Sequence, residues 1–447
     1  MIAGTGSGCG KTTVTCALLA AFSQNGIRAA AFKCGPDYID PMFHREILGT
    51  PSHNLDGFFC DTDTLCYLLD HGANHTDLAV IEGVMGFYDG GSGSAYQLSQ
   101  RTETAVIAVI DCKGMQDSIG AVMLGFLRYR TPNRIIGFIF NRLPERLVPF
   151  AQELCRTLKT GYFGFLPPQK EMLESRHLGL VTADEIPDLK AKMRSLGELA
   201  SKTLCLESLL ALPDLPLPAY IPPEIPHLPK KTRIAVAKDR AFCFLYDENI
   251  RLLEQIGCDI KFFSPITDVR IPEADGLLLC GGYPELYAEQ LSNNSAMLTS
   301  IRNAVFSGMP TIAECGGFLY LHTELQTKDG SCYPMVNTIS GSAFPTERLQ
   351  RFGYITMTAK NDSMICNAGQ KIRAHEFHYW DSTVCGNSFQ AEKTDGRIWN
   401  CCHTSASLYA GFPHLYFYQD TSMAVRFAQA ALQYGEQYES HSTDPSA

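Results

Sequence analysis

The sequence has no hydrophobic run long enough to span a bilayer and no excess of positive charge. Every apolar stretch is short and interrupted, and nothing at the start of the sequence has the pattern of a signal peptide. Lys and Arg together number 37 against 47 Asp and Glu, which gives a formal net charge of −10. General attraction to nucleic acid or to an anionic membrane is therefore not expected. The composition predicts a soluble protein, and the lack of an export signal predicts a cytoplasmic location.

Cys-x-x-Cys pairs are also missing, although the chain contains 17 cysteines. An odd number of cysteines without an export signal argues against a disulfide framework, and the spacing argues against a zinc ribbon. We expect reduced, mostly buried thiols. No internal repeat is visible, and 447 residues are too many for one ordinary domain.

A proline-rich segment divides the chain. Residues 211–231 contain seven prolines, which fix φ and remove backbone donors, so this stretch should run extended as a linker. The division predicts a first domain at 1–210, the linker at 211–231, a second domain at 232–435 and an unstructured polar tail at 436–447.

Short apolar strands alternate with amphipathic helices on both sides of the linker. The strands are expected at 28–33, 78–83, 104–111, 134–141, 232–238, 259–265, 275–282 and 310–315. This rhythm is typical of buried parallel sheets, which bind ligands at the carboxyl ends of their strands. The predicted fold class is α/β, with two domains that each contain a mostly parallel sheet flanked by helices.

A glycine-rich loop, "GTGSGCGKTT", opens the first domain at residues 4–13. In such loops backbone N–H groups wrap a phosphate, a Lys reaches the β- and γ-oxygens, and a hydroxyl holds Mg²⁺. Thr5 stands where the usual pattern has its first Gly. We predict an ATP site with Mg²⁺; its residues are Gly6, Gly8, Gly10, Lys11, Thr12 and Thr13. The early loop lacks the additional Lys of the partitioning-type switch ATPases, which favours a catalyst of small-molecule phosphorylation.

Four carboxylates follow the strands of this domain. Glu82 ends a strand, where P-loop enzymes carry a Mg²⁺ ligand, so we predict that Thr12 and Glu82 hold the metal. Asp37, Asp40 and Asp89 lie on turn-prone loops, and alone they could be ordinary turn residues. Together they exceed what nucleotide binding requires and indicate a substrate or phosphoryl-transfer site.

A cysteine at a tight turn marks the second domain. The strand at 310–314 ends at Cys315, and two glycines and a helix follow, as in a nucleophile elbow. We expect the helix dipole and a nearby His to lower the thiol pKa. Three glycines are candidates for the oxyanion hole; they are Gly281, Gly282 and Gly316. The candidate bases are His375, His378 and His414, and the "HEFH" spacing is not that of a zinc helix.

Nine ordered motifs carry a family resemblance. They are "AGTGSGCGKTT", "FKCGPDYIDPMFH", "NLDGFF", "EGVMGFYDG", "SRHLGLV", "AFCFLYDEN", "GGYPELYAEQL", "AECGGFLYL" and "HEFHYWD". In this order they resemble the cobyrinate a,c-diamide synthase family. The resemblance implies a dethiobiotin-synthetase-like P-loop domain followed by a class I glutamine amidotransferase domain of the cobyric-acid-synthase type.

The resemblance also implies a reaction. A corrinoid carboxylate would attack the γ-phosphorus of ATP to give an acyl phosphate, while Cys315 attacks glutamine and His414 moves the protons. The released ammonia would amidate side chains c and a. The implied partners are cobyrinate, L-glutamine and ATP, and a homodimer is an open expectation. The sequence departs from the family pattern at Tyr416, where a second His is usual, and no acidic third member of a triad is obvious.

Several alternatives stay open on the sequence alone. Nickel-sirohydrochlorin and hydrogenobyrinate diamide synthases share these motifs, and cobyric acid synthase is a more distant rival. A regulatory P-loop ATPase with a vestigial glutaminase domain is the non-enzyme alternative, and carboxylation like that of dethiobiotin synthetase would leave the second domain unexplained. Because a polyanionic substrate needs local cations, Arg45, Arg101 and Arg176 are further candidates.

Overall fold

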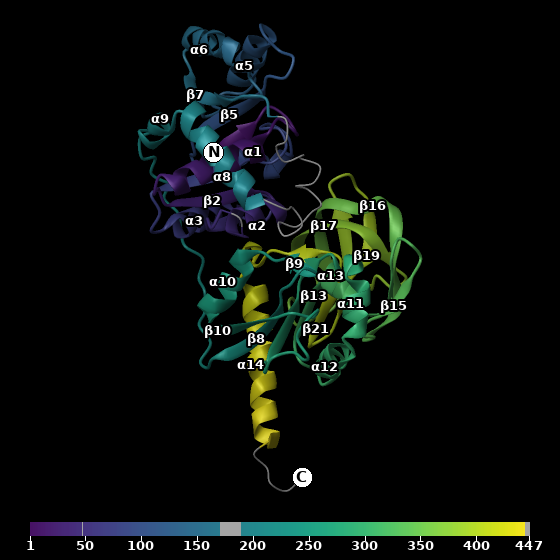
Figure 1. Ribbon diagram of the computed structural model, residues 1–447. Helices are drawn as coiled ribbons and strands as arrows, with labels where there is room; N and C mark the ends of the chain where they lie inside the picture. The colour runs from purple at the N-terminus through teal and green to yellow at the C-terminus, as the bar shows by residue number, and fades with distance from the viewer. Residues whose placement is uncertain (47, 170–188, 443–447) are drawn as a thin grey trace. The chain divides into compact units, whose positions relative to one another are not determined.

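The computed structural model describes residues 1–46, 48–169 and 189–442, and it divides into two compact units (Figure 1). The units are Met1–Pro223 and Glu224–Ala447, so the division falls inside the proline-rich segment at 211–231. Within the described ranges, no helix combines the length and apolarity that crossing a membrane requires. The motif at 175–181, including Arg176, lies outside the described residues.

The first unit is built on a seven-stranded parallel sheet. Its strand order is β3-β2-β4-β1-β5-β6-β7, and every neighbouring pair is parallel. The strands are β1 (Ile2–Gly4), β2 (Ala29–Cys34), β3 (Ser52–Leu55), β4 (Leu78–Glu82), β5 (Val106–Asp111), β6 (Ile135–Asn141) and β7 (Gly161–Leu166). All four strands predicted before the linker are confirmed within two residues at each end, because their apolar runs are buried between helices.

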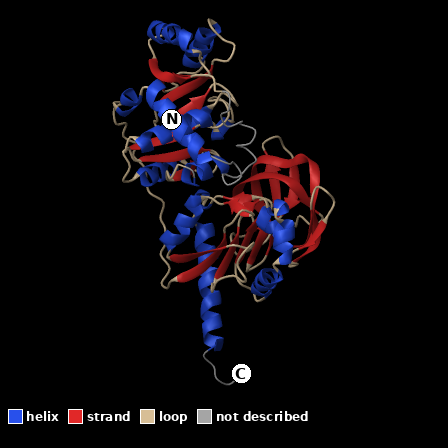
Figure 2. Ribbon diagram, in the orientation of Figure 1, coloured by secondary structure: helices blue, strands red, loops and turns tan. Residues whose placement is uncertain are grey.

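Helices flank this sheet (Figure 2). They are α1 (Lys11–Gln24), α2 (Ile39–Glu46), α3 (Thr62–Ala73), α4 (Ala95–Arg101), α5 (Ser118–Arg128), α6 (Val148–Thr157), α8 (Leu189–Thr203) and α9 (Leu206–Leu210). Helix α1 is buried at every residue from Val14 to Phe22. A helix that is apolar all round must be covered on all sides. Residues of the sheet and of α8, among them Met193 and Leu196, form one hydrophobic core with α1.

The second unit contains a six-stranded sheet in the order β10-β8-β11-β13-β21-β20. The strands are β8 (Thr232–Ala237), β10 (Cys258–Phe263), β11 (Gly276–Leu279), β13 (Thr311–Glu314), β20 (His403–Thr404) and β21 (Leu408–Gly411). All neighbours are parallel except the edge pair of β20 and β21. The α/β class with a mostly parallel sheet in each unit is therefore confirmed.

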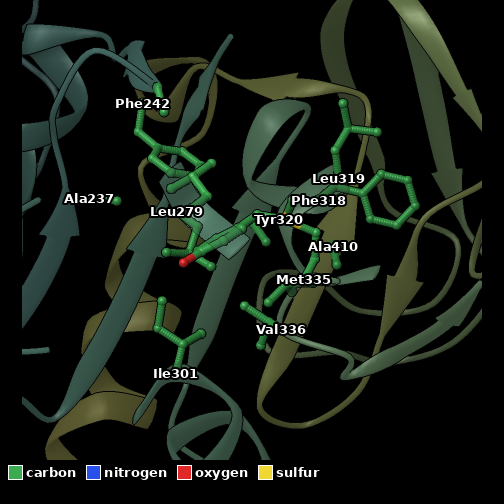
Figure 3. Packing of buried hydrophobic residues seen from close by; sticks show 14 of the residues in the cluster. Ala237, Phe242, Leu279, Ile301, Phe318, Leu319, Tyr320, Met335, Val336 and Ala410 are labelled. Atoms are coloured by element: carbon green, nitrogen blue, oxygen red, sulfur yellow. The ribbon is translucent and has the colours of Figure 1, made fainter. Parts of the chain in front are cut away.

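Helices cover both faces of this parallel sheet. They are α10 (Asp247–Ile256), α11 (Ala288–Asn293), α12 (Ser295–Phe306), α13 (Gly316–Tyr320) and α14 (Ser422–Ser442). On one face, Leu279 of β11, Ile301 of α12 and Phe318 of α13 belong to a single core (Figure 3). On the other face, Phe427 and Ala431 of α14 lie against the site of Gly276.

A second, mostly antiparallel sheet in this unit was not predicted. Its path is β15-β14-β16-β17-β22, with β18 and β19 beyond β16, and β14 and β16 are its one parallel pair. The strands are β14 (His322–Gln326), β15 (Cys332–Pro334), β16 (Ile339–Ala359), β17 (Lys371–Ser382), β18 (Phe389–Lys393), β19 (Ile398–Cys401) and β22 (His414–Leu415). Buried and exposed residues largely alternate along β17 and β18, so these strands lack the continuous apolar runs of strands that are buried on both faces.

The predicted polar tail differs from the structure at its start. Helix α14 continues to Ser442, so the helix includes the first half of the stretch expected to be unstructured. Glu436, Gln437 and Glu439 have good helix propensity, and they extend a helix whose earlier turns are anchored on the sheet.

Two short connections of the second unit also matter for its site. Strand β12 (Gly281–Gly282) pairs with β9 (Phe242–Phe244), and a 3₁₀ turn, η4 (Pro284–Leu286), follows β12.

Candidate active sites

The phosphate loop lies between β1 and α1. Gly10 has φ 93°, a left-handed conformation that favours glycine, and a side chain there would collide with Asn141 at the end of β6. The amide of Asn141 donates to the carbonyl of Cys9 at 3.0 Å. Asn141 therefore braces the loop from across the sheet, a role that sequence analysis missed.

Lys11 and Thr12 begin α1 beside the loop. The Lys11 ammonium donates to the carbonyl of Gly6 at 3.3 Å, and burial lowers its pKa. The Thr12 hydroxyl donates to Glu82 Oε1 at 2.6 Å. Thr13 lies in the same first turn of α1. The two predicted metal ligands, Thr12 and Glu82, are thus brought into direct contact.

Glu82 is completely buried at the end of β4. Its Oε2 atom has no hydrogen-bond partner within the described ranges, and it lies 3.7 Å from His44 Nε2. Burial, followed by the nearby Asp40, raises the pKa of Glu82 to about 7. Burial also lowers the pKa of His44 to about 4, so this imidazole is neutral and gives no compensating charge. An acceptor oxygen left open next to a hydroxyl suits a hard divalent cation with oxygen ligands.

Lys33, at the end of β2, is the central cation of this edge and was not singled out from the sequence. Its ammonium lies 3.0 Å from Glu82 Oε1 and 3.8 Å from Asp37 Oδ2, and it also pairs with Asp40. Burial opposes the charge of Lys33, but Asp40, Glu82 and Asp37 outweigh burial and raise the pKa of Lys33. The signal was present in "FKCGPDYID", because the carboxyl ends of adjacent parallel strands meet at one edge.

The predicted aspartates have different surroundings. Burial opposes the ionisation of Asp40, yet Lys33 lowers its pKa. Asp37 accepts the backbone N–H of Ile39 at 2.8 Å, and burial and then Asp40 raise its pKa to about 6. Asp89 lies on the loop after β4, where its carboxylate would meet a side chain placed at Gly86, next to Gly6. All three aspartates lie at the edge that carries the phosphate loop.

The candidate arginines are less well suited to a substrate. Arg101 donates to the carbonyls of Gly57 at 2.9 Å and Cys60 at 2.6 Å, and Arg45 donates to the carbonyl of Ser52 at 2.8 Å. These guanidinium groups bind backbone carbonyls and hold loops together. Their charge alone was therefore a poor guide to a substrate-binding role.

Cys315 has the backbone of a nucleophile elbow, as predicted. It joins β13 to α13 with φ 45° and ψ −100°, and its N–H donates to the carbonyl of Gly411 at 2.8 Å. A positive φ in a non-glycine residue is uncommon and strained, and such residues cluster at functional sites.

The predicted oxyanion glycines meet beside the cysteine. A Cβ on Gly316 would lie 2.9 Å from the backbone nitrogen of Gly282, and a Cβ on Gly281 would lie 2.5 Å from Cε1 of His414. The Cys315 elbow therefore packs against the Gly281–Gly282 turn, and this turn packs against the His414 ring. Neither contact leaves room for an additional carbon atom.

Of the three candidate bases, His414 lies at this turn. It belongs to β22 and is 1% exposed, and its Nδ1 lies 3.6 Å from Glu314 Oε2. His375 pairs with His414 across the β17–β22 ladder, and its ring contacts Phe352 and Tyr354. Burial and then His414 lower the pKa of His375 to about 3.

The structure corrects one expectation for Cys315. Its pKa is raised above the usual value by burial and then by the carboxylates of Glu285 and Glu376, and the N–H of Gly316 only partly opposes this. Helix α13 has five residues, so its dipole is small. The surroundings of Cys315 therefore disfavour its thiolate form.

Comparison with known proteins shows the family to which the chain belongs. A family model described as a CobQ/CobB/MinD/ParA nucleotide binding domain matches residues 1–180, and one described as a CobB/CobQ-like glutamine amidotransferase domain matches residues 233–421. A relative from Fusobacterium nucleatum, named cobyrinate a,c-diamide synthase, is 36% identical over 94% of this chain and 97% of its own. The chain belongs to the cobyrinate a,c-diamide synthase family.

Other relatives of the same name support this assignment. The cobyrinate a,c-diamide synthase of Salmonella typhimurium is 36% identical, with 96% of this chain and 97% of the relative covered. Among solved structures, MinD of Aquifex aeolicus has a TM-score of 0.30 at 14% identity and covers 44% of this chain and 94% of its own. A glutamine amidotransferase structure has a TM-score of 0.32 at 13% identity, with coverages of 44% and 98%.

Proposed function

We propose that this chain uses ATP and L-glutamine to amidate the a and c side-chain carboxylates of cobyrinate in cobalamin synthesis. The observation that carries the proposal is that one chain of this family contains both a buried Lys–carboxylate cluster at a phosphate loop and a strained Cys elbow beside a His. The first group of residues suits phosphoryl transfer, and the second suits the release of ammonia from an amide.

In the first unit, the loop N–H groups and Lys11 would hold the phosphates of ATP. Thr12 and Glu82 would hold Mg²⁺, and the open Oε2 atom of Glu82 fits that role. When bound, the ion would neutralise phosphate oxygens. Lys33 favours the ionised forms of Asp40 and Glu82, and its ion pairs hold both side chains in place before the substrates arrive.

The activating step joins the substrate carboxylate to phosphorus. A carboxylate oxygen forms the new O–P bond with the γ-phosphorus, the bond to the bridging oxygen breaks, and ADP leaves. Ammonia then adds to the acyl carbon, and inorganic phosphate leaves as the amide forms. We assign Asp37, Asp40 and Asp89 to the substrate side of this site, where they would position the reacting groups.

In the second unit, Cys315 would attack the side-chain amide of glutamine. The thiol proton passes to His414, the carbon–nitrogen bond breaks, and ammonia leaves with that proton. Water then cleaves the thioester to give glutamate. The N–H groups at Gly281, Gly282 and Gly316 would stabilise the tetrahedral oxyanion, and Glu314 would orient the His414 ring.

The proposal is tested by incubating the purified protein with ATP, L-glutamine and cobyrinate, hydrogenobyrinate or nickel-sirohydrochlorin in competition. We expect mass spectrometry to find two carboxylate-to-amide conversions on cobyrinate ahead of the other macrocycles. If the protein prefers another macrocycle, that macrocycle replaces cobyrinate as the proposed substrate. ATP hydrolysis without any amidation would favour a regulatory ATPase. The homodimer and the cytoplasmic location stay predictions.

A further inference from the structure

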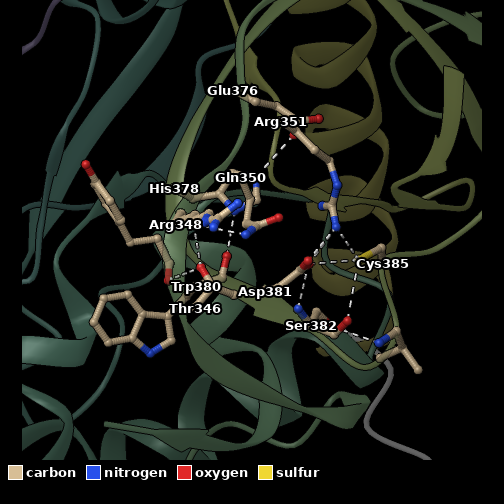
Figure 4. A network of polar contacts seen from close by, with 12 residues as sticks. Thr346, Arg348, Gln350, Arg351, Glu376, His378, Trp380, Asp381, Ser382 and Cys385 are labelled. Atoms are coloured by element: carbon tan, nitrogen blue, oxygen red, sulfur yellow. Dashed lines mark hydrogen bonds and ion pairs between the residues drawn. The ribbon is translucent and has the colours of Figure 1, made fainter. Parts of the chain in front are cut away.

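Glu376 is a buried acid that the mechanism above does not use. It lies on β17 with His378 and Trp380, on the face of the strand that points into the unit, and it is 0% exposed. Its Oε2 lies 3.1 Å from His378 Nε2, and His378 Nδ1 donates to the carbonyl of Trp380 at 2.5 Å (Figure 4). The His378 ring is therefore held at one nitrogen by the Trp380 carbonyl and at the other by the Glu376 side chain.

The other oxygen of Glu376 has no such partner. Oε1 is buried and makes no hydrogen bond to any residue that the structure describes. Arg351 is a nearby cation, but both oxygens of Asp381 already occupy it, at 2.8 and 2.6 Å. A buried carboxylate oxygen without a donor is costly, and such an atom in a native fold calls for a ligand or another explanation.

Glu376 belongs to the surroundings of Cys315. The His378 ring stacks on Phe412 with ring centroids 3.8 Å apart, and Phe412 directly follows Gly411, whose carbonyl accepts the Cys315 N–H. The Glu376 carboxylate is also one of the two acids outside β13 that raise the pKa of the Cys315 thiol. The Glu376 carboxylate is therefore close enough to the Cys315 thiol to influence its charge.

We propose that Glu376 Oε1 binds the α-ammonium group of L-glutamine while Cys315 attacks the side-chain amide. This inference rests on the proposed role of Cys315. The α-ammonium is the only cation that glutamine carries, and it supplies the donors that Oε1 lacks. His378 and Phe412 act as positioning residues, because His378 holds Oε2 of Glu376 and its ring is itself stacked on Phe412.

The arrangement gives the substrate a second effect. Binding an ammonium cation at Glu376 removes one of the negative charges that disfavour the Cys315 thiolate. Glu285 and Glu314 remain near the thiol, and His414 remains the proposed acceptor of its proton. Glutamine would thus promote ionisation of the nucleophile that attacks it, and the free enzyme would keep an unreactive thiol.

The test compares L-glutamine with glutaramate, the same molecule without its α-amino group, as substrates of the full-length enzyme. The readout is the ratio of the two kcat/KM values for ammonia release. We expect wild type to favour L-glutamine by about 10- to 100-fold, and Glu376→Gln to bring the ratio close to one. Glu347→Gln, which changes an exposed acid on β16, should keep the wild-type ratio.

The outcomes separate the two levels of the proposal. General damage to the fold lowers both kcat/KM values together and leaves their ratio unchanged. If wild type releases ammonia and Glu376→Gln keeps full selectivity, the role of Glu376 is wrong. If wild type itself releases none, the role of Cys315 fails. If Glu376→Gln does not fold, Glu376→Asp takes its place, because it shortens the side chain by one methylene and keeps the charge. This variant must give a ratio of kcat/KM values between one and the wild-type ratio. An unchanged ratio overturns the inference.

Discussion

His414 Nδ1 lies 3.6 Å from Glu314 Oε2, and Glu314 directly precedes Cys315 in the chain. The other oxygen of Glu314 accepts the N–H of Leu415 at 3.0 Å. One carboxylate therefore connects the end of β13, which leads into Cys315, to the strand that carries the proposed base.

Replacing this carboxylate should slow glutamine hydrolysis. We expect Glu314→Gln to lower kcat by about 10- to 100-fold, because a charge-assisted contact to the imidazole is lost while the shape is kept. Steady-state ammonia release measures this effect. Amidation with added ammonium should stay at the wild-type rate, and equal loss with both nitrogen donors would contradict a role confined to the second unit.

Cys315→Ser should abolish the use of glutamine and spare amidation with free ammonium. The reason is that the two half-reactions are assigned to separate sites. Product formation is measured with each nitrogen donor in turn. Cys332→Ser, which changes an exposed cysteine, is the matched control and should retain both activities. A Cys315→Ser enzyme that still hydrolyses glutamine would exclude Cys315 as the nucleophile.

The pH dependence of Cys315 alkylation follows from its surroundings. Burial, Glu285 and Glu376 raise its pKa, so the thiolate is the minor form at neutral pH and increases as the pH rises. We expect the rate of alkylation by a neutral haloacetamide to rise about tenfold per pH unit between about pH 7 and 9. Peptide mapping isolates this residue from the other cysteines. A rate that is already constant near pH 7 would mean that the thiol pKa is low in the free enzyme.

Lys33→Gln should destabilise the first unit, because it leaves Glu82 and Asp40 buried without their cation. Removing one partner from a buried ionic network costs about 3–5 kcal/mol. Thermal unfolding should show this loss, and added Mg²⁺ should partly reverse it. Arg28→Ala, which breaks an exposed ion pair with Asp77, should change little.

The activities of the Lys33 variant provide a second readout. Amidation should fail with either nitrogen donor, while glutamine hydrolysis by the second unit persists. If Lys33→Gln amidates the substrate at the wild-type rate, Lys33 has no role in the proposed site.

The sequence predicted features that local patterns specify. The phosphate loop, the buried strands and the Cys315 elbow each depend on a short run of residues with a direct steric or hydrophobic cause. The contact between Thr12 and Glu82 followed from the rule that parallel strands end at one edge.

The residues that were missed depend on contacts distant in sequence. Asn141 reaches the loop from 132 positions away, and Glu314 meets His414 only because β13, β17 and β22 come together. The raised pKa of Cys315 was missed for the same reason, since Glu376 lies on a strand of the sheet that was not predicted. Pattern reasoning predicted the elbow at Cys315, but the electrostatic surroundings of this residue required the tertiary structure.

The most direct measurement follows the amide nitrogen of L-glutamine, isotopically labelled, into the corrinoid product. With ATP present, the account predicts that wild-type protein places one labelled nitrogen in each new amide, and that omission of ATP or the Cys315→Ser change prevents labelling. Unlabelled amides formed from glutamine, or labelled product without ATP consumption, would contradict the claim that one chain couples glutamine hydrolysis to phosphate-activated amidation.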